Sequence, residues 1–526
     1  MGKRNRSTTG RRGRAIAPAL TGIIAAGALF AVAELLSAFF GTVSSPLTSM
    51  GSTFIDFTPS WMKNFAISTF GTNDKTVLLL SMAIATVILA AIAGLAAARK
   101  LIVGASMVVV FAAVMIATII TRSGATVLDL VPVVIGTVAG LFVLRYLTLA
   151  AQRAWANQPD PKNHEDTVQS PNRRSFILGA ALIAGGSLVV GIGGNLLSTA
   201  RNTARQFRDA LKLPAAKTKA APLPDGVAVS VDGVVPFVTP NADFYRIDTA
   251  LAVPQLDPNS WELRVHGMVE NEFTMSFSEL LASDLVESHV TLTCVSNVVG
   301  GNLVGNAKWL GYPLREIMAR AKPKGGADMV LSTSSDGFSA STPLPALQDD
   351  RGAILAVGMN DEPLPLEHGF PVRMVVPGLY GFVSATKWVV DLEVTTFAEK
   401  AGYWTSRGWS SHGPIKTSSR VEVPKALARV PAGRVAVGGT AWAQTRGISK
   451  VEVKLDNGQW QAAELGAEAS LITWRQWQFI WNDAKPGIHK VQVRAYDGAG
   501  TLQVEDQAPP EPDGSTGWHT ITFNVV

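Results

Sequence analysis

Residues 291–301, TLTCVSNVVGG, contain Cys294, the only cysteine in the 526-residue chain. The β-branched run before it, residues 289–293, predicts a strand, and the polar, glycine-rich residues after it predict a turn. Cys294 is therefore expected at a strand end facing a cavity, where functional groups often lie. As a lone cysteine it can form no disulfide within the chain.

A free cysteine is most often a small buried hydrophobic residue, and this interpretation of Cys294 stays open. As a thiolate, it would be a soft metal ligand or a nucleophile. Nucleophilic use would normally need a histidine base. The seven histidines have no helical metal-site spacing, so a zinc hydrolase is not expected. They are His164, His266, His289, His368, His412, His489 and His519.

Three motifs, in order, resemble the sulfite oxidase family of molybdenum-cofactor oxidoreductases. They are the TLTCVSN segment, the HGFPVRMVVPG segment at residues 368–378, and Lys387-Trp388. In that family, the cysteine thiolate is the single protein ligand to molybdenum, and the pterin dithiolene and oxo groups fill the other positions. The resemblance therefore implies a molybdenum-molybdopterin cofactor, with Cys294 as metal ligand and catalytic residue.

The resemblance also implies which residues bind the cofactor. Asn241, Phe244 and Tyr245 lie in a segment that resembles the family's first pterin-contacting loop. His368 and Arg373 match the family positions that hold the phosphate end of the cofactor, and Lys387 matches the lysine near the pterin. Arginine suits such a role because its planar fork matches phosphate oxygens. Taken singly, each residue would be read as an ordinary turn or surface residue. Residues 378–381, GLYG, could bring backbone amides close to the pterin, and plain turn geometry explains them equally well.

The chain departs from the family at two substrate anchors. Sulfite oxidases carry an arginine in the cysteine loop and a tyrosine before the M-N-x-x-P-L-P stretch, where this chain has Val298 and Val357. A buried anion without its cations is poorly compensated, so sulfite as the substrate is in doubt. Only the general layout suggests that Arg407, His412 and Lys416 line a substrate pocket. The substrate class expected is a small oxyanion or an S- or N-oxide.

The chain is 47% hydrophobic and 17% charged, which is too apolar for an ordinary soluble protein, and the excess lies almost wholly before residue 200. Five long apolar runs predict transmembrane helices at about residues 15–40, 76–98, 101–121, 130–149 and 176–197. The first could be a cleaved signal peptide, but its run is long and further runs follow. Glu34 lies within this first span, and an interfacial position is favoured over a functional one.

Basic residues before and between the spans predict a cytoplasmic N-terminus. Five spans then place the C-terminal half outside the cell membrane, in a multi-pass protein. Arg173-Arg174, directly before the fifth span, resemble a twin-arginine export signal inside the chain. They could also be plain positive-inside anchors. Molybdopterin is assembled in the cytoplasm, so a domain that holds it must cross already folded, which the twin-arginine route permits.

The expected fold class is an α-helical membrane region, then an α+β molybdopterin domain of the sulfite oxidase type, then an immunoglobulin-like β-sandwich. The last is indicated by short alternating strands after about residue 403, at residues 434–442, 448–455, 476–481 and 488–496. It resembles the family's dimerisation domain, which implies a possible homodimer. The domain bounds are 1–200 for the membrane domain, 201–231 for a linker, 232–400 for the catalytic domain and 401–526 for the sandwich.

The leading functional hypothesis is a membrane-anchored enzyme that performs two-electron oxygen-atom transfer at a cysteine-ligated oxo-molybdenum centre. A single cysteine and no histidine within the spans predict neither an iron–sulfur cluster nor a membrane haem. A separate carrier, a cytochrome or a quinone-linked protein, should therefore exchange electrons with it. No basic-aromatic pattern predicts nucleic-acid binding. The alternative is a non-catalytic, membrane-tethered interaction module on a relic cofactor fold, and a transporter is less favoured.

Overall fold

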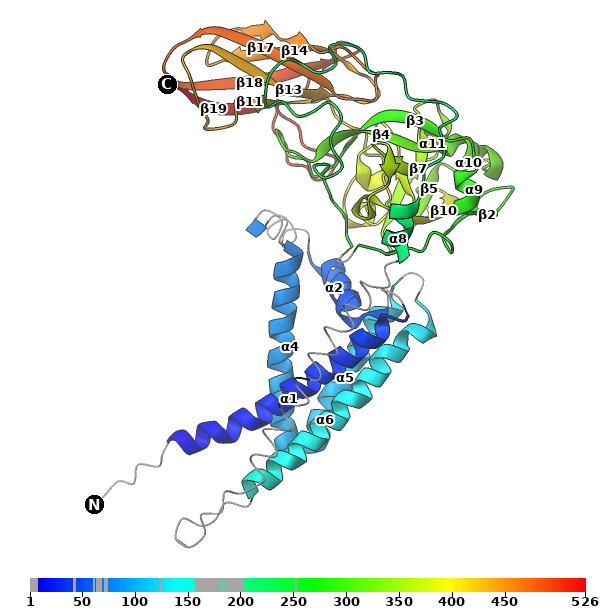
Figure 1. Cartoon of the computed structure of the whole chain (residues 1–526), viewed down its shortest axis with the longest axis vertical. Coiled ribbons are helices and arrows are strands. Elements are labelled where there is room, and N and C mark those ends of the chain that lie inside the picture. Colours follow the sequence, from blue (N-terminus) through cyan, green and yellow to red (C-terminus); the bar gives the residue numbers. More distant parts are fainter. Residues whose placement is uncertain are drawn as a thin grey trace, which may run out of the picture. The chain divides into compact units, whose positions relative to one another are not determined.

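The computed structural model describes residues 8–40, 44–59, 62, 69–70, 74–122, 125–156, 181, 185, 203–250 and 253–526. The chain divides into two compact units. The first comprises residues 1–202 with 249–253, and the second comprises residues 203–248 with 254–526. The first is helical and the second is rich in strands (Figure 1).

Among the described residues of the first unit, four helices are long and apolar enough to cross a membrane. They are α1 (Thr8–Ser37), α4 (Asp74–Arg99), α5 (Leu101–Ile120) and α6 (Val131–Ala156). These helices coincide with the first four predicted spans, so the apolar helices themselves are confirmed. The predicted fifth span, residues 176–197, and Arg173-Arg174 lie outside the described residues, so their roles stay predictions.

Close approach of helices in the first unit depends on small residues. α1 packs against both α4 and α6. Gly22 of α1 meets α4 so closely that a Cβ there would lie 1.9 Å from the carbonyl oxygen of Ala90. Small residues at such contacts are typical of helices that associate in membranes, because close backbone approach maximises van der Waals contact.

A short helix not predicted from the sequence, α2 (Pro46–Phe57), follows α1. The Glu34 carboxylate accepts hydrogen bonds from the Ser45 hydroxyl, at 2.9 Å, and from the Leu47 N–H, at 3.0 Å. Both donors belong to the N-terminal end of α2, where backbone N–H groups lack helical acceptors. Glu34 therefore has a structural role in capping this helix.

The first part of the second unit contains two sheets and short helices. One sheet has the order β2-β1-β10-β5-β6, and the other has β3-β4-β7-β8 with β9 also paired to β7. The strands are β1 (Glu262–Gly267), β2 (Phe273–Ser276), β3 (Val286–Thr293), β4 (Val304–Pro313), β5 (Met329–Ser334), β6 (Ser339–Pro343), β7 (Ile354–Met359), β8 (Glu362–Pro363), β9 (Arg373–Val375) and β10 (Val389–Thr395). The helices are α9 (Phe277–Leu281), α10 (Leu314–Ala321) and α11 (Pro345–Gln348), with single turns η4 (Leu366–His368), η5 (Gly381–Val383) and η6 (Thr405–Arg407).

The position of Cys294 follows from the pairing of β3 with β4. The two strands are antiparallel, with Thr291 opposite Asn306 and Thr293 opposite Val304. β3 ends at Thr293, so Cys294 is the first residue of the connecting loop, as predicted. β-branched residues favour strands. Residues 286–289 of β3 are partly buried, and residues 290–293 are fully buried.

The C-terminal part is a sandwich of two sheets, with the orders β11-β13-β17-β16 and β12-β19-β18-β14-β15. Its strands are β11 (Ser418–Val423), β12 (Arg429–Val430), β13 (Gly433–Trp442), β14 (Ile448–Leu455), β15 (Trp460–Ala462), β16 (Glu464–Leu465), β17 (Arg475–Ala484), β18 (Gly487–Asp497) and β19 (His519–Val525). The four strands predicted here match β13, β14, β17 and β18. An immunoglobulin-type topology and a dimerisation role stay predictions.

The segment predicted as a linker, residues 201–231, is in part folded against the second unit. It contains helix α8 (Thr203–Ala210), whose Arg208 donates to the carbonyl oxygen of Leu364 at 2.9 Å. Farther along, the Lys217 N–H donates to the Leu285 carbonyl oxygen at 2.8 Å. This stretch is proline-rich, yet it forms hydrogen bonds with the rest of the second unit.

Candidate active site

Cys294 lies in a tight loop that buries its thiol. The side chain is 8% exposed, and its N–H donates to the Leu303 carbonyl oxygen at 2.9 Å while its own carbonyl accepts from the Asn297 N–H at 3.1 Å. Burial raises the pKa of the thiol, whereas hydrogen bonds from Ser296 oppose that rise. Donors on the sulfur stabilise a thiolate, so this loop suits a soft metal ligand.

Arg373, on β9, is a buried cation without a carboxylate partner. It is 5% exposed, and its guanidinium donates to the carbonyl oxygens of His368, Met374 and Ala385 at 3.2, 3.4 and 3.4 Å. Burial lowers its pKa to about 10. No carboxylate in residues 203–250 or 253–526 forms an ion pair with it. An uncompensated buried charge is costly, so this site fits an anionic group such as a cofactor phosphate.

Lys387 lies in the same neighbourhood. Its ammonium forms an ion pair with Asp248 at 2.9 Å and donates to the Glu367 carbonyl oxygen at 3.1 Å. Burial lowers the pKa of Lys387 to about 8, while Asp248 opposes that shift. The positive charge of Lys387 opposes the rise that burial causes in the pKa of the Cys294 thiol.

His368 completes this basic group. Its Nε2 lies 3.2 Å from the Asn241 carbonyl oxygen. Burial, with smaller contributions from Arg373 and Lys387, lowers the pKa of His368 to about 4. The imidazole is therefore neutral at neutral pH, and because its Nε2 must donate to the Asn241 carbonyl oxygen, Nδ1 remains as a hydrogen-bond acceptor.

Residues 241–245 pack beside His368. The Phe244 ring stacks on Tyr245 at 5.2 Å and meets Trp309 and His368 edge-on at 5.8 and 5.6 Å. A Cβ on Gly305 would lie 2.8 Å from Phe244, so glycine permits this packing. Burial raises the pKa of Tyr245, and a Cys294 thiolate would raise it further.

Asn241 is held by residues next to β7 and β8. Its amide nitrogen donates to Glu362 at 2.6 Å, and its side-chain oxygen accepts from Asn360 at 2.8 Å. The structure thus gathers the predicted cofactor residues around Cys294: Asn241, Phe244, Tyr245, His368, Arg373 and Lys387. Their binding role stays a prediction.

The residues suggested for a substrate pocket take separate partners. Arg407 lies 3.6 Å above the Tyr403 ring, His412 stacks on Phe397 at 4.7 Å, and Lys416 forms an ion pair with Asp513 at 2.8 Å. None of the three lines the pocket beside the cysteine loop. That they bind substrate stays a prediction.

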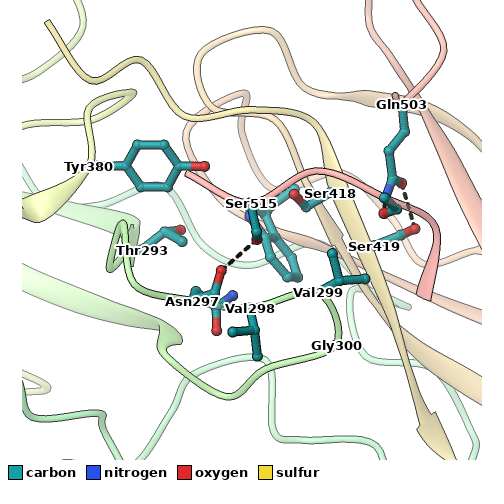
Figure 2. Close-up of a pocket in the computed structure, with 12 residues that line it drawn as sticks. Thr293, Asn297, Val298, Val299, Gly300, Tyr380, Ser418, Ser419, Gln503 and Ser515 are labelled. Carbon is teal, nitrogen blue, oxygen red and sulfur yellow. Dashed lines mark hydrogen bonds between the residues drawn. The ribbon is translucent and has the colours of Figure 1, made fainter. Parts of the chain in front are cut away.

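A pocket lies between the cysteine loop and the C-terminal sandwich (Figure 2). Thr293, Asn297 and Val298 line it from the loop, Tyr380 from the segment before η5, and Ser418 and Ser515 from the sandwich side. Tyr380 is 3% exposed, and burial raises the pKa of its phenol to about 12. A Cys294 thiolate also raises that pKa, so Tyr380 is near the thiol.

The sandwich holds the cysteine loop directly. The Ser515 hydroxyl donates to the Asn297 carbonyl oxygen at 2.6 Å, and Arg420 donates to the Gly301 carbonyl oxygen at 2.8 Å. Gly300 has a φ of +75°, and a Cβ there would lie 2.2 Å from the ring of His519. Glycine is therefore required for both the turn and the contact.

Some of these residues were not found from the sequence. Tyr380 was assigned only to a backbone turn near the pterin, and Ser515 and Arg420 were not singled out. Arg420 and Glu422 lie two positions apart in a strand and therefore on one face of it, a spacing that could have marked the buried ion pair that they form. Ser515 lies in a turn-rich stretch without periodicity, and no local signal relates it to the cysteine loop.

Residues 250–404 match the oxidoreductase molybdopterin-binding domain family. Mitochondrial sulfite oxidase of Macaca fascicularis is 29% identical over 344 residues, which cover 55% of this chain and 62% of that protein. An uncharacterised oxidoreductase of Bacillus subtilis strain 168, YuiH, is 32% identical over 157 residues, covering 30% of this chain and 76% of that protein. The solved structure of the sulfane dehydrogenase SoxCD of Paracoccus pantotrophus has a TM-score of 0.49 and 22% identity, covering 56% of this chain and 85% of that chain.

The cysteine loop and its basic neighbours thus lie in a molybdopterin-binding oxidoreductase domain. The chain belongs to the sulfite oxidase family of molybdopterin-dependent oxidoreductases. It spans 62% of the length of the mitochondrial sulfite oxidase that it matches.

Proposed function

We propose that this chain is a membrane-anchored molybdopterin-dependent oxidoreductase that performs two-electron oxygen-atom transfer at a molybdenum ion ligated by Cys294. The observation that carries the proposal is the buried guanidinium of Arg373, which has no carboxylate partner among the described residues of its unit. A cofactor phosphate would supply the missing negative charge. When bound, the molybdenum cofactor supplies the two-electron redox chemistry.

The protein residues bind and orient the cofactor. Cys294 offers a sulfur that already accepts hydrogen bonds from Ser296, which favours the thiolate form needed for ligation. Arg373 and Lys387 would supply positive charge beside the anionic group, and His368, whose Nε2 donates to the Asn241 carbonyl oxygen, would help to hold residues 241–245 in place. The loop is fixed from the sandwich side by Ser515 and Arg420, which limits motion of the ligand.

The apolar helices α1, α4, α5 and α6 would anchor the enzyme in the cell membrane, with the C-terminal half on the extracytoplasmic side. Arg173-Arg174 would direct export of the folded domain. A separate one-electron carrier, a cytochrome or a quinone-linked protein, would exchange electrons with the molybdenum, and the sandwich would mediate homodimerisation.

The test compares the purified wild-type protein with Cys294→Ser for molybdenum content and for turnover of a panel of oxyanions and S- and N-oxides with an artificial electron carrier. Molybdenum in the wild type, with loss of turnover in Cys294→Ser, is expected. A wild type extracted from native membranes without molybdenum would favour the relic interaction module. Full activity of Cys294→Ser would contradict ligation by Cys294.

A further inference from the structure

Helix α8 packs on the rest of the second unit through its apolar side chains. Ala204 is 1% exposed, and the Phe207 ring meets the ring of Phe277 in α9 edge-on at 6.3 Å. Directly after the helix, Leu211 and Leu213 also pack against the core of this unit. Burial of these apolar side chains stabilises the docked position of α8.

The segment after α8 continues across the β3-β4-β7-β8 sheet. Leu213 lies directly over Gly358 of β7, where a Cβ would be 2.7 Å from the Leu213 Cδ1 atom. Farther along, the Thr218 carbonyl oxygen accepts a hydrogen bond from the Glu287 N–H of β3 at 2.8 Å. Residues 203–218, which we name the strap, therefore contact the sheet at several separate points.

Arg208 joins the strap to β8 and to the residue that follows it. Its guanidinium donates to the carbonyl oxygens of Pro363 and Leu364 at 3.0 and 2.9 Å, and it forms an ion pair with Glu362 at 2.9 Å. The Arg208 side chain is 18% exposed, so these interactions are partly shielded from solvent. One side chain of the strap thus holds three consecutive residues.

Asn241 is held by three residues in and around β8. The Glu362 carboxylate accepts from the Asn241 amide at 2.6 Å, and such a charge-assisted bond is stronger than a neutral one. Asn360 donates to the Asn241 side-chain oxygen at 2.8 Å, and His368 Nε2 donates to its backbone carbonyl oxygen at 3.2 Å. Glu362 is the one of the three that also pairs with Arg208, so the strap supports the position of Asn241.

Asn241 begins the segment 241–245, which contains three of the predicted cofactor residues. This segment starts as a short turn, in which the Asp243 and Phe244 N–H groups both donate to the Pro240 carbonyl oxygen at 3.0 Å. Short turns open readily unless contacts with other segments hold them. The contacts of Asn241 therefore influence how often the segment opens.

We infer that the strap keeps residues 241–245 in the conformation that retains the cofactor, and that Arg208 and Glu362 are positioning residues that slow cofactor release. The inference rests on the proposed function, because it assumes that a cofactor binds beside residues 241–245. Arg208 acts through Glu362 and through the backbone of β8, not through contact with the cofactor.

Hydrogen exchange tests the first step of this inference without any cofactor. The full chain is produced in cells that cannot synthesise molybdopterin, and exchange of the amide hydrogens of residues 241–245 is followed by mass spectrometry. Arg208→Met should raise this exchange rate about tenfold, because it removes an ion pair and two hydrogen bonds to carbonyl groups. Glu362→Gln keeps an acceptor for Asn241 and loses only the charge, so its effect should be smaller.

The rate of cofactor release is the second readout. Molybdenum-loaded wild type and variants are incubated, free cofactor is removed by gel filtration at intervals, and the bound pterin is measured by fluorescence. Arg208→Met should release the cofactor about tenfold faster than the wild type. In a Glu362→Ala background, Arg208→Met should add less than it does alone, because part of its effect passes through Glu362.

Arg475 of β17 provides a matched control for Arg208. Its side chain is 22% exposed and pairs with Glu468 at 3.8 Å, and it donates to the carbonyl oxygens of Gly466 and Ile448, both at 2.8 Å. Arg475→Met should leave both rates at the wild-type value. Unchanged exchange in Arg208→Met would overturn the inference, and so would equal rises in both variants, which would indicate a loss of general stability.

The two readouts also separate this inference from the proposed function. A wild type that contains no molybdenum would contradict the proposed function, while exchange in the cofactor-free protein would still decide whether the strap holds residues 241–245. Molybdenum-loaded protein with equal release rates in the wild type and Arg208→Met would overturn the inference and leave the proposed function in place.

Discussion

The hydroxyl of Ser515 donates a 2.6 Å hydrogen bond to the backbone carbonyl of Asn297, three residues after Cys294. Asn297 lies in the loop between β3 and β4, and Ser515 lies in the segment between β18 and β19, 218 positions farther along the chain. The C-terminal sandwich thereby contacts the loop that carries the proposed metal ligand, and its effect on the site can be measured.

Ser515→Ala should loosen the cysteine loop while the fold is retained. A neutral hydrogen bond contributes about 1 kcal/mol, so we expect turnover to fall roughly fivefold with little loss of molybdenum. The molybdenum(V) paramagnetic resonance spectrum should become more heterogeneous, and Ser515→Thr should restore it. Ser449→Ala removes a comparable bond to Asp497 elsewhere in the sandwich and should leave the spectrum unchanged. Equal effects of both alanine variants would point to stability alone.

Arg373→Met should separate cofactor retention from folding. The variant loses hydrogen bonds to three carbonyl groups but also removes an unpaired buried charge. These effects offset each other, so the free energy of unfolding of the cofactor-free protein should change by no more than about 2 kcal/mol. Molybdenum and pterin content should fall at least tenfold.

The control for that variant is Arg320→Met, because Arg320 is half-exposed and paired with Glu279 at 2.7 Å. It should retain the cofactor at the wild-type level. Thermal unfolding and metal analysis of the same samples provide both readouts. Full cofactor content in Arg373→Met would contradict the assignment of this residue to an anionic cofactor group.

His519 should make the protein less stable in acid. Burial lowers its pKa from 6.5 to about 4 in the folded protein. Between these values the unfolded chain binds more protons, so this contribution to stability is complete above pH 6.5 and is lost as the pH falls toward 4. The loss is at most about 3 kcal/mol. His368, whose pKa is also lowered to about 4, acts in the same direction.

His519→Gln should therefore reduce the slope of unfolding free energy between pH 6.5 and 4 without removing it. His489 provides a control that acts in another pH range, because its hydrogen bond to Asp456 raises its pKa above 6.5, so its contribution to stability is complete below pH 6.5 and is lost as the pH rises. His489→Gln should leave the slope between pH 6.5 and 4 unchanged and remove a loss of stability above pH 6.5. Denaturant titrations at several pH values measure both slopes, and an unchanged slope in His519→Gln would contradict the prediction.

Replacement of Arg173-Arg174 by two lysines should leave the C-terminal half in the cytoplasm while the first four spans still insert. Lysine keeps the positive charge, so an anchoring role under the positive-inside rule would be preserved, and only a signal that needs arginine would fail. Protease accessibility of the C-terminal half in spheroplasts measures its side. Export in cells that lack the twin-arginine translocase would contradict the prediction.

Local patterns predicted much of the fold. The strand that ends before Cys294 and the four apolar helices follow from short-range periodicity and composition. The family motifs likewise predicted the residues that gather around Cys294. These features are encoded by neighbouring residues, so one sequence is sufficient to find them.

The relations between distant segments could not be read in this way. Lys387 pairs with Asp248, which lies 139 positions earlier, and the pocket combines the cysteine loop with Ser515 and Ser418 of the sandwich part. Tyr380 was assigned to a turn because the glycines beside it dominate the local pattern, although its side chain lines the pocket. Such contacts depend on how the sheets pack, and no periodicity records that packing.

The most direct test of the central claim, that Cys294 ligates molybdenum, is X-ray absorption at the molybdenum edge of the purified wild type and Cys294→Ser. Ligation by Cys294 predicts that the variant, where it retains metal, shows one sulfur neighbour fewer than the wild type and no turnover. The same sulfur coordination in both proteins would contradict the account.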